Sequence, residues 1–155
     1  MCFYNEMREV TMDASEVLYM RRTGPYGREN HALMECFKVW LKRQGLRVED
    51  EVILAVPLDD PYAIEPWKCR YDVCVTGHAG LESGPDGVGV RRLDGGRYVI
   101  FLIGHTADAV QRAWSECFSA LERHGYLRDP SRPAMERYAG RLVQAHFCEL
   151  CVPIL

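Results

Sequence analysis

The sequence predicts one α+β domain built from two similar halves. Three observations favour it: two amphipathic helical segments, short apolar strand-like segments between them, and a repeated order of these elements. The chain has 155 residues, 48% of them hydrophobic and 26% charged, which is the size and composition of an ordinary globular domain. We therefore expect residues 1–155 to form a single domain with its own core.

The two helical segments have apolar residues three and four positions apart, which places those residues on one buried stripe of each helix. The first stripe is Leu33, Cys36, Phe37, Trp40 and Leu41, and the second is Val110, Ala113, Trp114, Cys117, Phe118 and Leu121. Gly45 and Gly125 are expected to end the helices, because glycine adopts the left-handed conformation of a C-cap at low cost. Thr106 is the expected N-cap of the second helix.

The strand-like segments are short. Val52–Leu58 and Tyr98–Ile103 are nearly all apolar, which predicts central strands covered by helices, and Tyr71–Thr76 is a third strand. The Asp94–Gly96 segment predicts a hairpin turn leading into the Tyr98 strand. Gly77–Gly87 is the segment whose composition is typical of a linker.

The order of elements repeats along the chain. Gly24 and Gly45 end a strand and the helix after it, and Gly104 and Gly125 do so again with the same separation. Two further strands follow each helix, which in the second half are Met135–Tyr138 and Phe147–Ile154. These pseudo-repeats, about 8–76 and 88–155, predict a pseudo-twofold antiparallel sheet with two helices on one side. A cleft is expected between the halves, where ligand pockets tend to lie.

Charge and targeting signals limit the function classes. The formal net charge is −3, which argues against a surface built to neutralise phosphates, so we expect no direct binding to nucleic acid. Residues 1–9 contain no apolar core of a signal peptide, and no apolar run has the length of a membrane span. An odd number of scattered cysteines, seven in all, favours reduced thiols rather than a disulfide framework. These features together predict a cytoplasmic protein without membrane contact.

Cys148 and Cys151 have the spacing of a zinc or redox motif. Their segment has the character of a strand, in which residues three apart point to opposite faces. Burial as small apolar side chains is therefore the favoured interpretation, and metal or redox chemistry is the alternative. We expect no metal and no other cofactor.

Six short motifs follow one another in a characteristic order. They are Gly-Pro-Tyr at 24–26, Asp-Asp-Pro at 59–61, Arg-Tyr-Asp at 70–72, Gly-Gly-Arg-Tyr at 95–98 followed by Gly104, Pro-x-x-Glu-x-Tyr at 133–138, and Val-Pro-Ile at 152–154. The ordered set resembles the GyrI-like (gyrase-inhibitor-like) family. The resemblance implies the fold of the effector-binding domains of AraC-type and MerR-type multidrug regulators. Strand-like sequence begins by Arg8, which leaves no room for a helix-turn-helix, so we expect a stand-alone member.

The resemblance also implies a site. In drug-binding members the glutamate that matches Glu136 faces the cleft and attracts flat cationic ligands, because a buried anion complements their charge while aromatic walls stack on them. The candidate walls are Tyr26, Trp67, Tyr71, Phe101, Trp114 and Tyr138. Tyr138 should point to the same side as Glu136, since the side-chain period of a strand is two.

Structural alternatives exist for several of these residues. Glu136 could instead form an ion pair with Arg21 or with a cation near Arg137. Phe101 and Trp114 could belong to the core, and Trp67 could cover the sheet or be exposed.

Three functions remain open at the level of sequence. Binding of a drug-like small molecule is favoured, with resistance to toxic compounds as its role. A hydrolase of strained electrophiles would use Glu136 as the general base and Tyr71 or Tyr138 as a hydrogen-bond donor. A third class is a protein-binding inhibitor with DNA gyrase as its partner.

Overall fold

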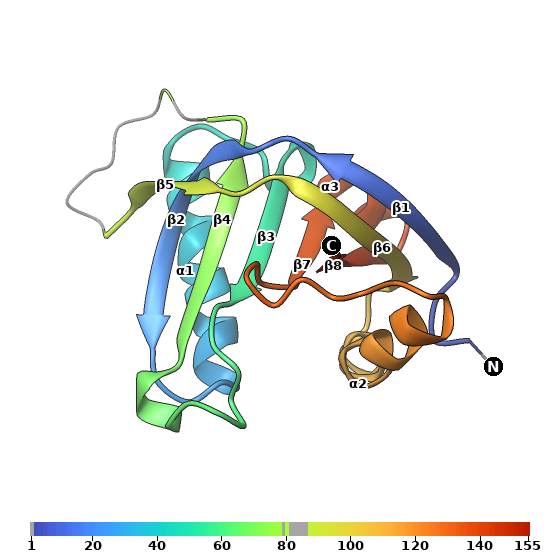
Figure 1. Ribbon diagram of the computed structural model, residues 1–155. Coiled ribbons are helices and arrows are strands. Elements are labelled where there is room, and N and C mark those ends of the chain that lie inside the picture. The colour runs from blue at the N-terminus through green and yellow to red at the C-terminus, as the bar shows by residue number, and fades with distance from the viewer. Residues whose placement is uncertain (1, 79, 81–86) are drawn as a thin grey trace.

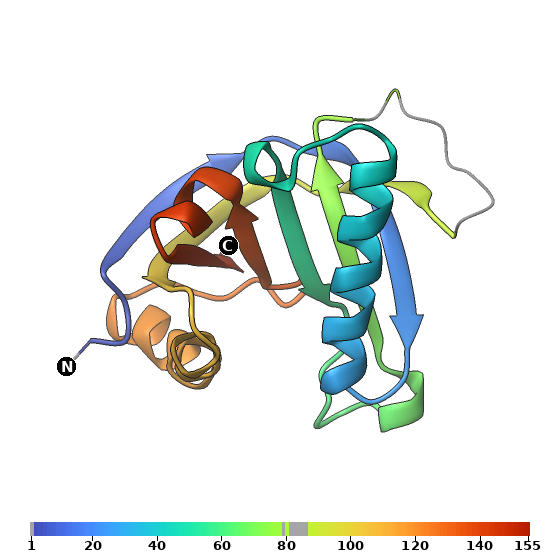
Figure 2. The same cartoon turned by 180° about the vertical axis from the view of Figure 1, so that it is seen from behind.

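The computed structural model describes residues 2–78, 80 and 87–155. Its centre is an eight-stranded antiparallel sheet that curls into a half-barrel, with both long helices on one face (Figures 1 and 2). The predicted α+β fold is therefore confirmed. Most of the predicted linker at 77–87 lies outside the described residues.

The described residues form eight strands, three α-helices and two 3-10 turns. The strands are β1 (Glu6–Met12), β2 (Ser15–Thr23), β3 (Val52–Pro57), β4 (Arg70–Thr76), β5 (Gly89–Leu93), β6 (Gly96–Gly104), β7 (Met135–Ala139) and β8 (Phe147–Pro153). The helices are α1 (Arg28–Arg43), α2 (Ala107–Arg123) and α3 (Gly140–Gln144), and the 3-10 turns are η1 (Val48–Asp50) and η2 (Pro66–Lys68).

The strand order, β1-β6-β8-β7-β3-β4-β2-β5, carries the predicted pseudo-twofold relation. Strands β3 and β7 pair at the centre, and outward from them β4, β2 and β5 correspond to β8, β6 and β1. Helix α1 packs on β2 and β4, and α2 packs on β6 and β8. The two strand-helix-strand-strand halves thus meet side by side along the β3–β7 pair.

The connection at Asp94–Gly96 is not the predicted hairpin. Strand β5 pairs with β2, whereas β6 pairs with β1, so the chain passes here from one half of the sheet to the other. Glycine is needed for a different reason, because a Cβ on Gly95 would lie 2.5 Å from the backbone nitrogen of Ala14. The turn-forming residues therefore mark a close crossing of two backbones.

The predicted helix ends are confirmed. Gly45 and Gly125 adopt left-handed conformations with φ of 81° and 80°, and Thr106 Oγ1 accepts a hydrogen bond from the Ala109 N–H. Cys36, however, is exposed, because the buried stripe of α1 is centred on Phe37 and Leu41, and Cys36 lies about 100° around the helix from Phe37. None of the described helices is long and apolar enough to span a membrane.

Three clusters of buried side chains form the core. One lies under α1, one under α2, and the third lies on the opposite face of the sheet. Cys148 belongs to the cluster under α2 and Cys151 to the cluster on the opposite face, as the strand period predicts. Tyr138 packs against both helix-side clusters and so marks the seam between the halves.

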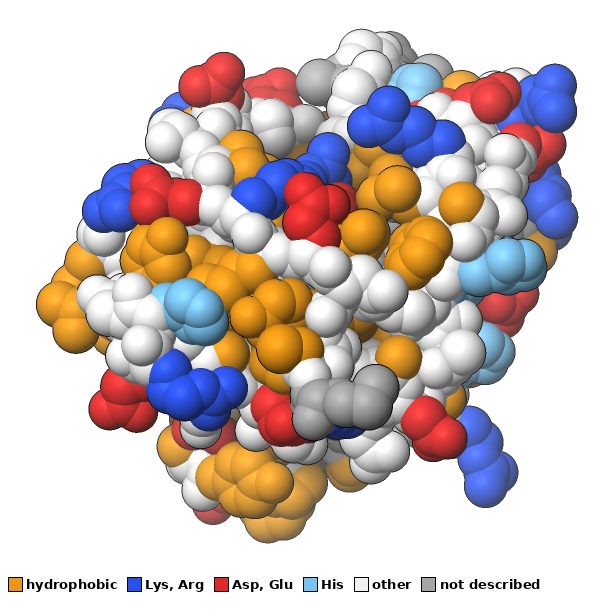
Figure 3. All heavy atoms as spheres, turned by 90° about the vertical axis from the view of Figure 1, so that its right-hand side faces the viewer, with side chains coloured by type: hydrophobic (Ala, Val, Ile, Leu, Met, Phe, Trp, Pro, Cys, Tyr) orange, Lys and Arg blue, Asp and Glu red, His pale blue; other side chains and the backbone are white. Residues whose placement is uncertain are grey.

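The outer surface near β1 and α2 mixes chemical types. Hydrophobic side chains are visible there between charged side chains of both signs (Figure 3).

Candidate ligand-binding site

A cavity of about 540 Å³ lies on the helix face of the sheet, with α1 on one side of it. Helices α1 and α2 lie apart from each other on that face (Figure 2). The floor of the cavity comes from the strands at and beside the pseudo-dyad and consists of Ile53, Tyr71, Glu136 and Tyr138. Its remaining walls come from α1 and its N-cap, from η1 and α3, and from the segment just before α2. They consist of Gly27, Asn30, His31, Met34, Lys38, Val48, Glu49, His105, Gly140, Val143 and Gln144.

Glu136 is the carboxylate on this floor. It lies on β7 directly opposite Ala55 of β3, and it is half-buried. Its Oε2 accepts a hydrogen bond of 2.6 Å from the indole Nε1 of Trp114, and its Oε1 accepts one of 2.5 Å from the Tyr138 hydroxyl. Both donors are neutral, so they orient the carboxylate without cancelling its charge.

The alternative interpretation of Glu136 as a member of an ion pair is wrong. Among the described residues, no Arg, Lys or His forms an ion pair with this carboxylate. Arg21 instead binds Asp72, with 2.7 Å between Arg21 Nε and Asp72 Oδ1, on the opposite face of the sheet.

Two tyrosines share the floor with Glu136. Burial, followed by the negative charge of Glu136, raises the pKa of both Tyr71 and Tyr138 well above the ordinary value. Both therefore remain neutral hydroxyls at physiological pH and can donate hydrogen bonds. The His105 ring meets the Tyr138 ring edge-on at a centroid distance of 5.5 Å, which extends the aromatic wall toward α2.

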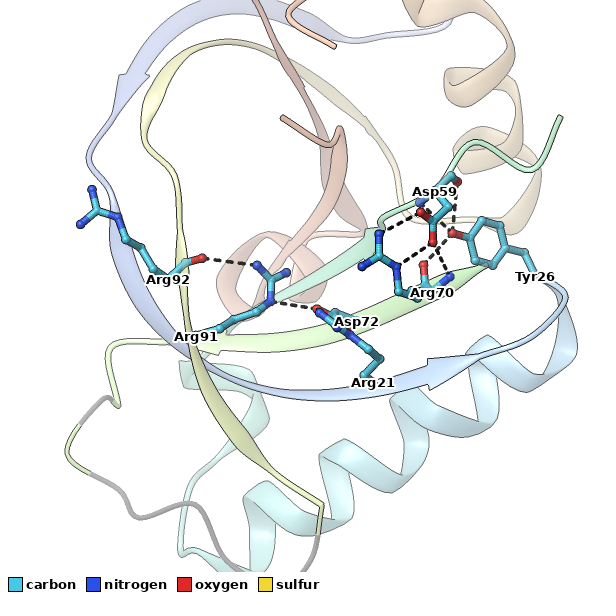
Figure 4. A network of polar contacts seen from close by, with 7 residues as sticks. All are labelled: Arg21, Tyr26, Asp59, Arg70, Asp72, Arg91 and Arg92. Carbon is cyan, nitrogen blue, oxygen red and sulfur yellow. Dashed lines mark hydrogen bonds and ion pairs between the residues drawn. The ribbon is translucent and has the colours of Figure 1, made fainter. Parts of the chain in front are cut away.

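Tyr26 lies behind this wall. Its ring is 6.1 Å from that of Tyr71, and it does not line the cavity. Its hydroxyl donates to the Arg70 carbonyl at 2.6 Å and accepts from the Asp59 N–H at 3.1 Å (Figure 4). The Arg70 guanidinium also binds the Asp59 carboxylate, at 2.9 Å. Tyr26 is thereby fixed against the back of Tyr71.

The other three predicted aromatic residues differ in position. Trp114 reaches the Glu136 carboxylate from α2 without lining the cavity. Phe101 is fully buried in the core under α2, where its ring contacts Phe3 and Tyr4. Trp67 lies on η2 with 64% of its surface exposed. The structure thus brings together Tyr71, Glu136 and Tyr138, with Trp114 and Tyr26 beside them, and it places Phe101 and Trp67 elsewhere.

The α1, η1 and α3 walls were not predicted from sequence. Met34 and Lys38 lie one turn apart at the edge of the buried stripe of α1, where periodicity does not separate core from cavity. Glu49 and Gln144 belong to short segments without a periodic pattern. Sequence analysis predicted the helix, but it predicted no segment that lies against the side of this helix facing the cavity.

The opposite face of the sheet holds two buried carboxylates in a structural role. Asp72 on β4 is fully buried and accepts from Arg21 and from Arg91 of β5, the latter at 2.8 Å (Figure 4). Glu149 on β8 is buried and binds Arg8 of β1 at 2.7 Å. In each half of the sheet, a buried carboxylate thus forms an ion pair with an arginine of the edge strand, which is β5 in one half and β1 in the other.

Comparison with known proteins identifies relatives over most of the chain. The model of the GyrI-like small molecule binding domain matches residues 5–155. A Bacillus subtilis (strain 168) protein named as a transcriptional regulator derived from the SPbeta prophage, YosT, is 39% identical over 140 residues, 89% of this chain and 91% of that protein. A DNA gyrase inhibitor of Pectobacterium carotovorum subsp. carotovorum (strain PC1) is 29% identical over 117 residues, 74% of each chain.

Solved structures share the fold at low identity. The C-terminal domain of EcmrR superposes with a TM-score of 0.71 at 12% identity, covering 97% of both chains. This chain spans 57% of the EcmrR chain in its complex with DNA. The structure of SAV2435 bound to tetraphenylphosphonium has a TM-score of 0.59 at 17% identity and covers 97% of this chain and 94% of that one.

Proposed function

Because the chain belongs to the family of GyrI-like small molecule binding domains, we propose that its cavity binds a cationic, aromatic small molecule. The observation that carries the proposal is the state of Glu136. This carboxylate lies on the cavity floor with two neutral hydrogen-bond donors and, among the described residues, no ion-pair partner.

The energetics favour a cation at this place. A carboxylate removed from water is costly unless an opposite charge or strong hydrogen bonds replace its hydration. Each oxygen of Glu136 accepts one hydrogen bond and keeps further lone pairs for a ligand. A bound cation supplies the missing positive charge inside the cavity, where Coulomb attraction is stronger than in water.

Aromatic side chains supply the second part of the recognition. Tyr71 and Tyr138 present rings to the cavity, and Tyr26 supports Tyr71 from behind. Such rings attract cations through their quadrupole and stack on flat ligands. Trp114 acts through Glu136, whose carboxylate it orients. Sequestration of toxic cations is the cellular role that we propose for this binding.

Calorimetric titration with tetraphenylphosphonium tests the proposal. The likeness to SAV2435 supports the choice of this permanently charged probe. We expect Glu136→Gln to weaken binding by at least about tenfold, because a pairing of charges becomes a contact with a neutral amide. The matched control is Glu65→Gln, which removes an exposed carboxylate paired with Lys68 outside the cavity and should leave affinity unchanged.

Two results would overturn the proposal. One is wild-type affinity in a folded Glu136→Gln variant, and the other is no binding of tetraphenylphosphonium to the folded wild-type protein. A thermal-shift assay gives an independent readout, since ligand at about a hundred times its dissociation constant adds about 2.7 kcal/mol to the stability of the folded state.

A second candidate function, hydrolysis, rests on the Glu136–Tyr138 pair. A carboxylate that accepts a hydrogen bond from a buried tyrosine in a cavity can act as general base on a water molecule, with Tyr71 as a further donor. The test is turnover of a strained electrophile, followed by chromatography. Hydrolysis that Glu136→Gln abolishes would support this function.

The relative named as a DNA gyrase inhibitor motivates a third test. A supercoiling assay with purified gyrase should show inhibition if this chain binds the enzyme through its surface. Such inhibition should persist in Glu136→Gln, whereas inhibition through the cavity should disappear.

A further inference from the structure

The end of the cavity at α1 has a chemical character opposite to that of Glu136. Gly27 and Asn30, at the start and in the first turn of α1, line the cavity. Gly27 is the N-cap and has no side chain with which to cap the helix, whereas Thr106 caps α2. The first turn of a helix carries unpaired N–H groups and the positive end of the helix dipole. Glu29 of this turn is exposed and does not line the cavity.

Asn30 adds a donor whose orientation is fixed. Arg22 Nη1 donates a hydrogen bond to Asn30 Oδ1. Because a guanidinium group can only donate, the amide oxygen must face Arg22, and the amide NH2 is left for another partner. The Arg22 charge beside Asn30 makes this end of the cavity still more positive.

Tyr71 adds a second donor, and this one is without a partner. Its side chain is only 8% exposed and lines the cavity, yet its hydroxyl makes no hydrogen bond with any of the described residues. Glu136 is not its acceptor, because the two carboxylate oxygens accept from Trp114 and Tyr138 and form no hydrogen bond with Tyr71. Because Tyr71 lines the cavity, an acceptor on a ligand can take the place of the water that would otherwise bind this hydroxyl.

We infer that the α1 end of the cavity is a subsite for a hydrogen-bond acceptor, formed by the Tyr71 hydroxyl, the Asn30 amide and the first turn of α1. The ligand is then a molecule with a cationic group at Glu136 and a carboxylate or carbonyl oxygen at its other end. The positive character of Arg22 and of the helix start favours the carboxylate. This inference rests on the proposed function, because it assumes that a cation occupies the floor of the same cavity.

Three phosphonium probes that differ only at one end test the subsite. They are pentyl-triphenylphosphonium, which has no acceptor, carboxybutyl-triphenylphosphonium, and the methyl ester of the latter. We expect the carboxylate probe to bind the wild-type protein about tenfold more tightly than the pentyl probe, with the ester between them, because hydrogen bonds to a charged acceptor are stronger than those to a neutral one.

Two variants assign this difference to the named groups. Tyr71→Phe deletes the hydroxyl and keeps the ring, and Asn30→Asp replaces the amide donor by an acceptor while keeping the partner of Arg22. Each should reduce the ratio of the affinities for the carboxylate and pentyl probes to about threefold or less, and this ratio cancels any change in affinity that both probes share. Glu136→Gln should weaken all three probes and preserve their order.

The outcomes separate the two proposals. Equal affinities of the wild-type protein for the three probes, all weakened by Glu136→Gln, would overturn the acceptor subsite and leave the cation site standing. A preference that persists in both Tyr71→Phe and Asn30→Asp would also overturn the subsite. Binding of none of the probes would overturn the cation site and the subsite with it.

Discussion

Gly140 lies so close to Glu49 that a Cβ at position 140 would be 2.1 Å from the Glu49 carbonyl oxygen. The contact joins the start of α3 to η1, and the Gly140 N–H also donates to the Glu51 carbonyl at 2.9 Å. Both segments line the cavity, so the absence of a side chain at position 140 sets the position of one cavity wall.

Gly140→Ala should therefore destabilise the protein. The added methyl group must push the η1 backbone away, which we expect to cost about 1–3 kcal/mol even though alanine favours helices. Thermal unfolding should show a lower melting temperature, by about 2–4 °C for each kcal/mol. Gly104→Ala is the matched control, because its Cβ would lie 3.6 Å from Ala109 Cβ, an ordinary contact. Equal melting temperatures for the wild-type protein and Gly140→Ala would contradict the steric argument.

Asp72→Asn should lower stability through the arginines that it leaves behind. Asp72 is fully buried and binds both Arg21 and Arg91, so neutralising it leaves two guanidinium groups without their anion. We expect a loss of about 3 kcal/mol in the free energy of unfolding, measured by urea titration. Glu65→Gln, at an exposed ion pair, should change stability by less than about 0.5 kcal/mol. A loss for Asp72→Asn no larger than that of Glu65→Gln would show that the buried pair contributes little.

Trp114→Phe should weaken cation binding without removing any cavity wall. The variant loses the indole N–H that orients Glu136 Oε2, while an aromatic side chain still packs on α2. We expect affinity for tetraphenylphosphonium to fall by up to about tenfold. Trp40→Phe is the control, because Trp40 is buried under α1 against Phe37 and does not line the cavity. Equal losses of affinity in both variants would indicate a general effect on folding instead.

Cysteine reactivity should divide the thiols into two groups. Cys2 and Cys36 are exposed and the other five cysteines, Cys69 among them, are buried. Burial raises the pKa of Cys74, Cys117, Cys148 and Cys151 to about 12. The thiolate is the reactive form, so a raised pKa leaves almost no nucleophile at pH 8. Mass spectrometry after brief treatment with iodoacetamide should find modification at Cys2 and Cys36 in the native protein and at all seven cysteines in urea. Rapid native modification of Cys148 or Cys151 would contradict this assignment.

Local sequence patterns predicted the elements that need only local information. The helix stripes, the caps at Gly45, Thr106 and Gly125, and the common side of Glu136 and Tyr138 all follow from backbone geometry over a few residues. The doubled order of elements also predicted the pseudo-dyad. Periodicity erred at Cys36, at the margin of a stripe, because the exact direction in which a helix faces depends on what it packs against.

Only the tertiary structure decided which strand edges pair and which side chains meet in the cavity. The residues of Asp94–Gly96 predict a turn, but they do not specify the strand with which β5 pairs. Strand β5 pairs with β2 of the first half, and β1 pairs with β6 of the second half. Asn30 and Glu49 line the cavity together with Glu136 of β7, more than eighty residues further along the chain, because α1 packs on β2 and β4 and η1 packs on α3. The composition and periodicity of the chain thus determined its elements, and the resemblance to the GyrI-like family indicated its candidate carboxylate. The environment of that carboxylate, with donors from Trp114 and Tyr138 and no cation among the described residues, follows from long-range packing that no local pattern specifies.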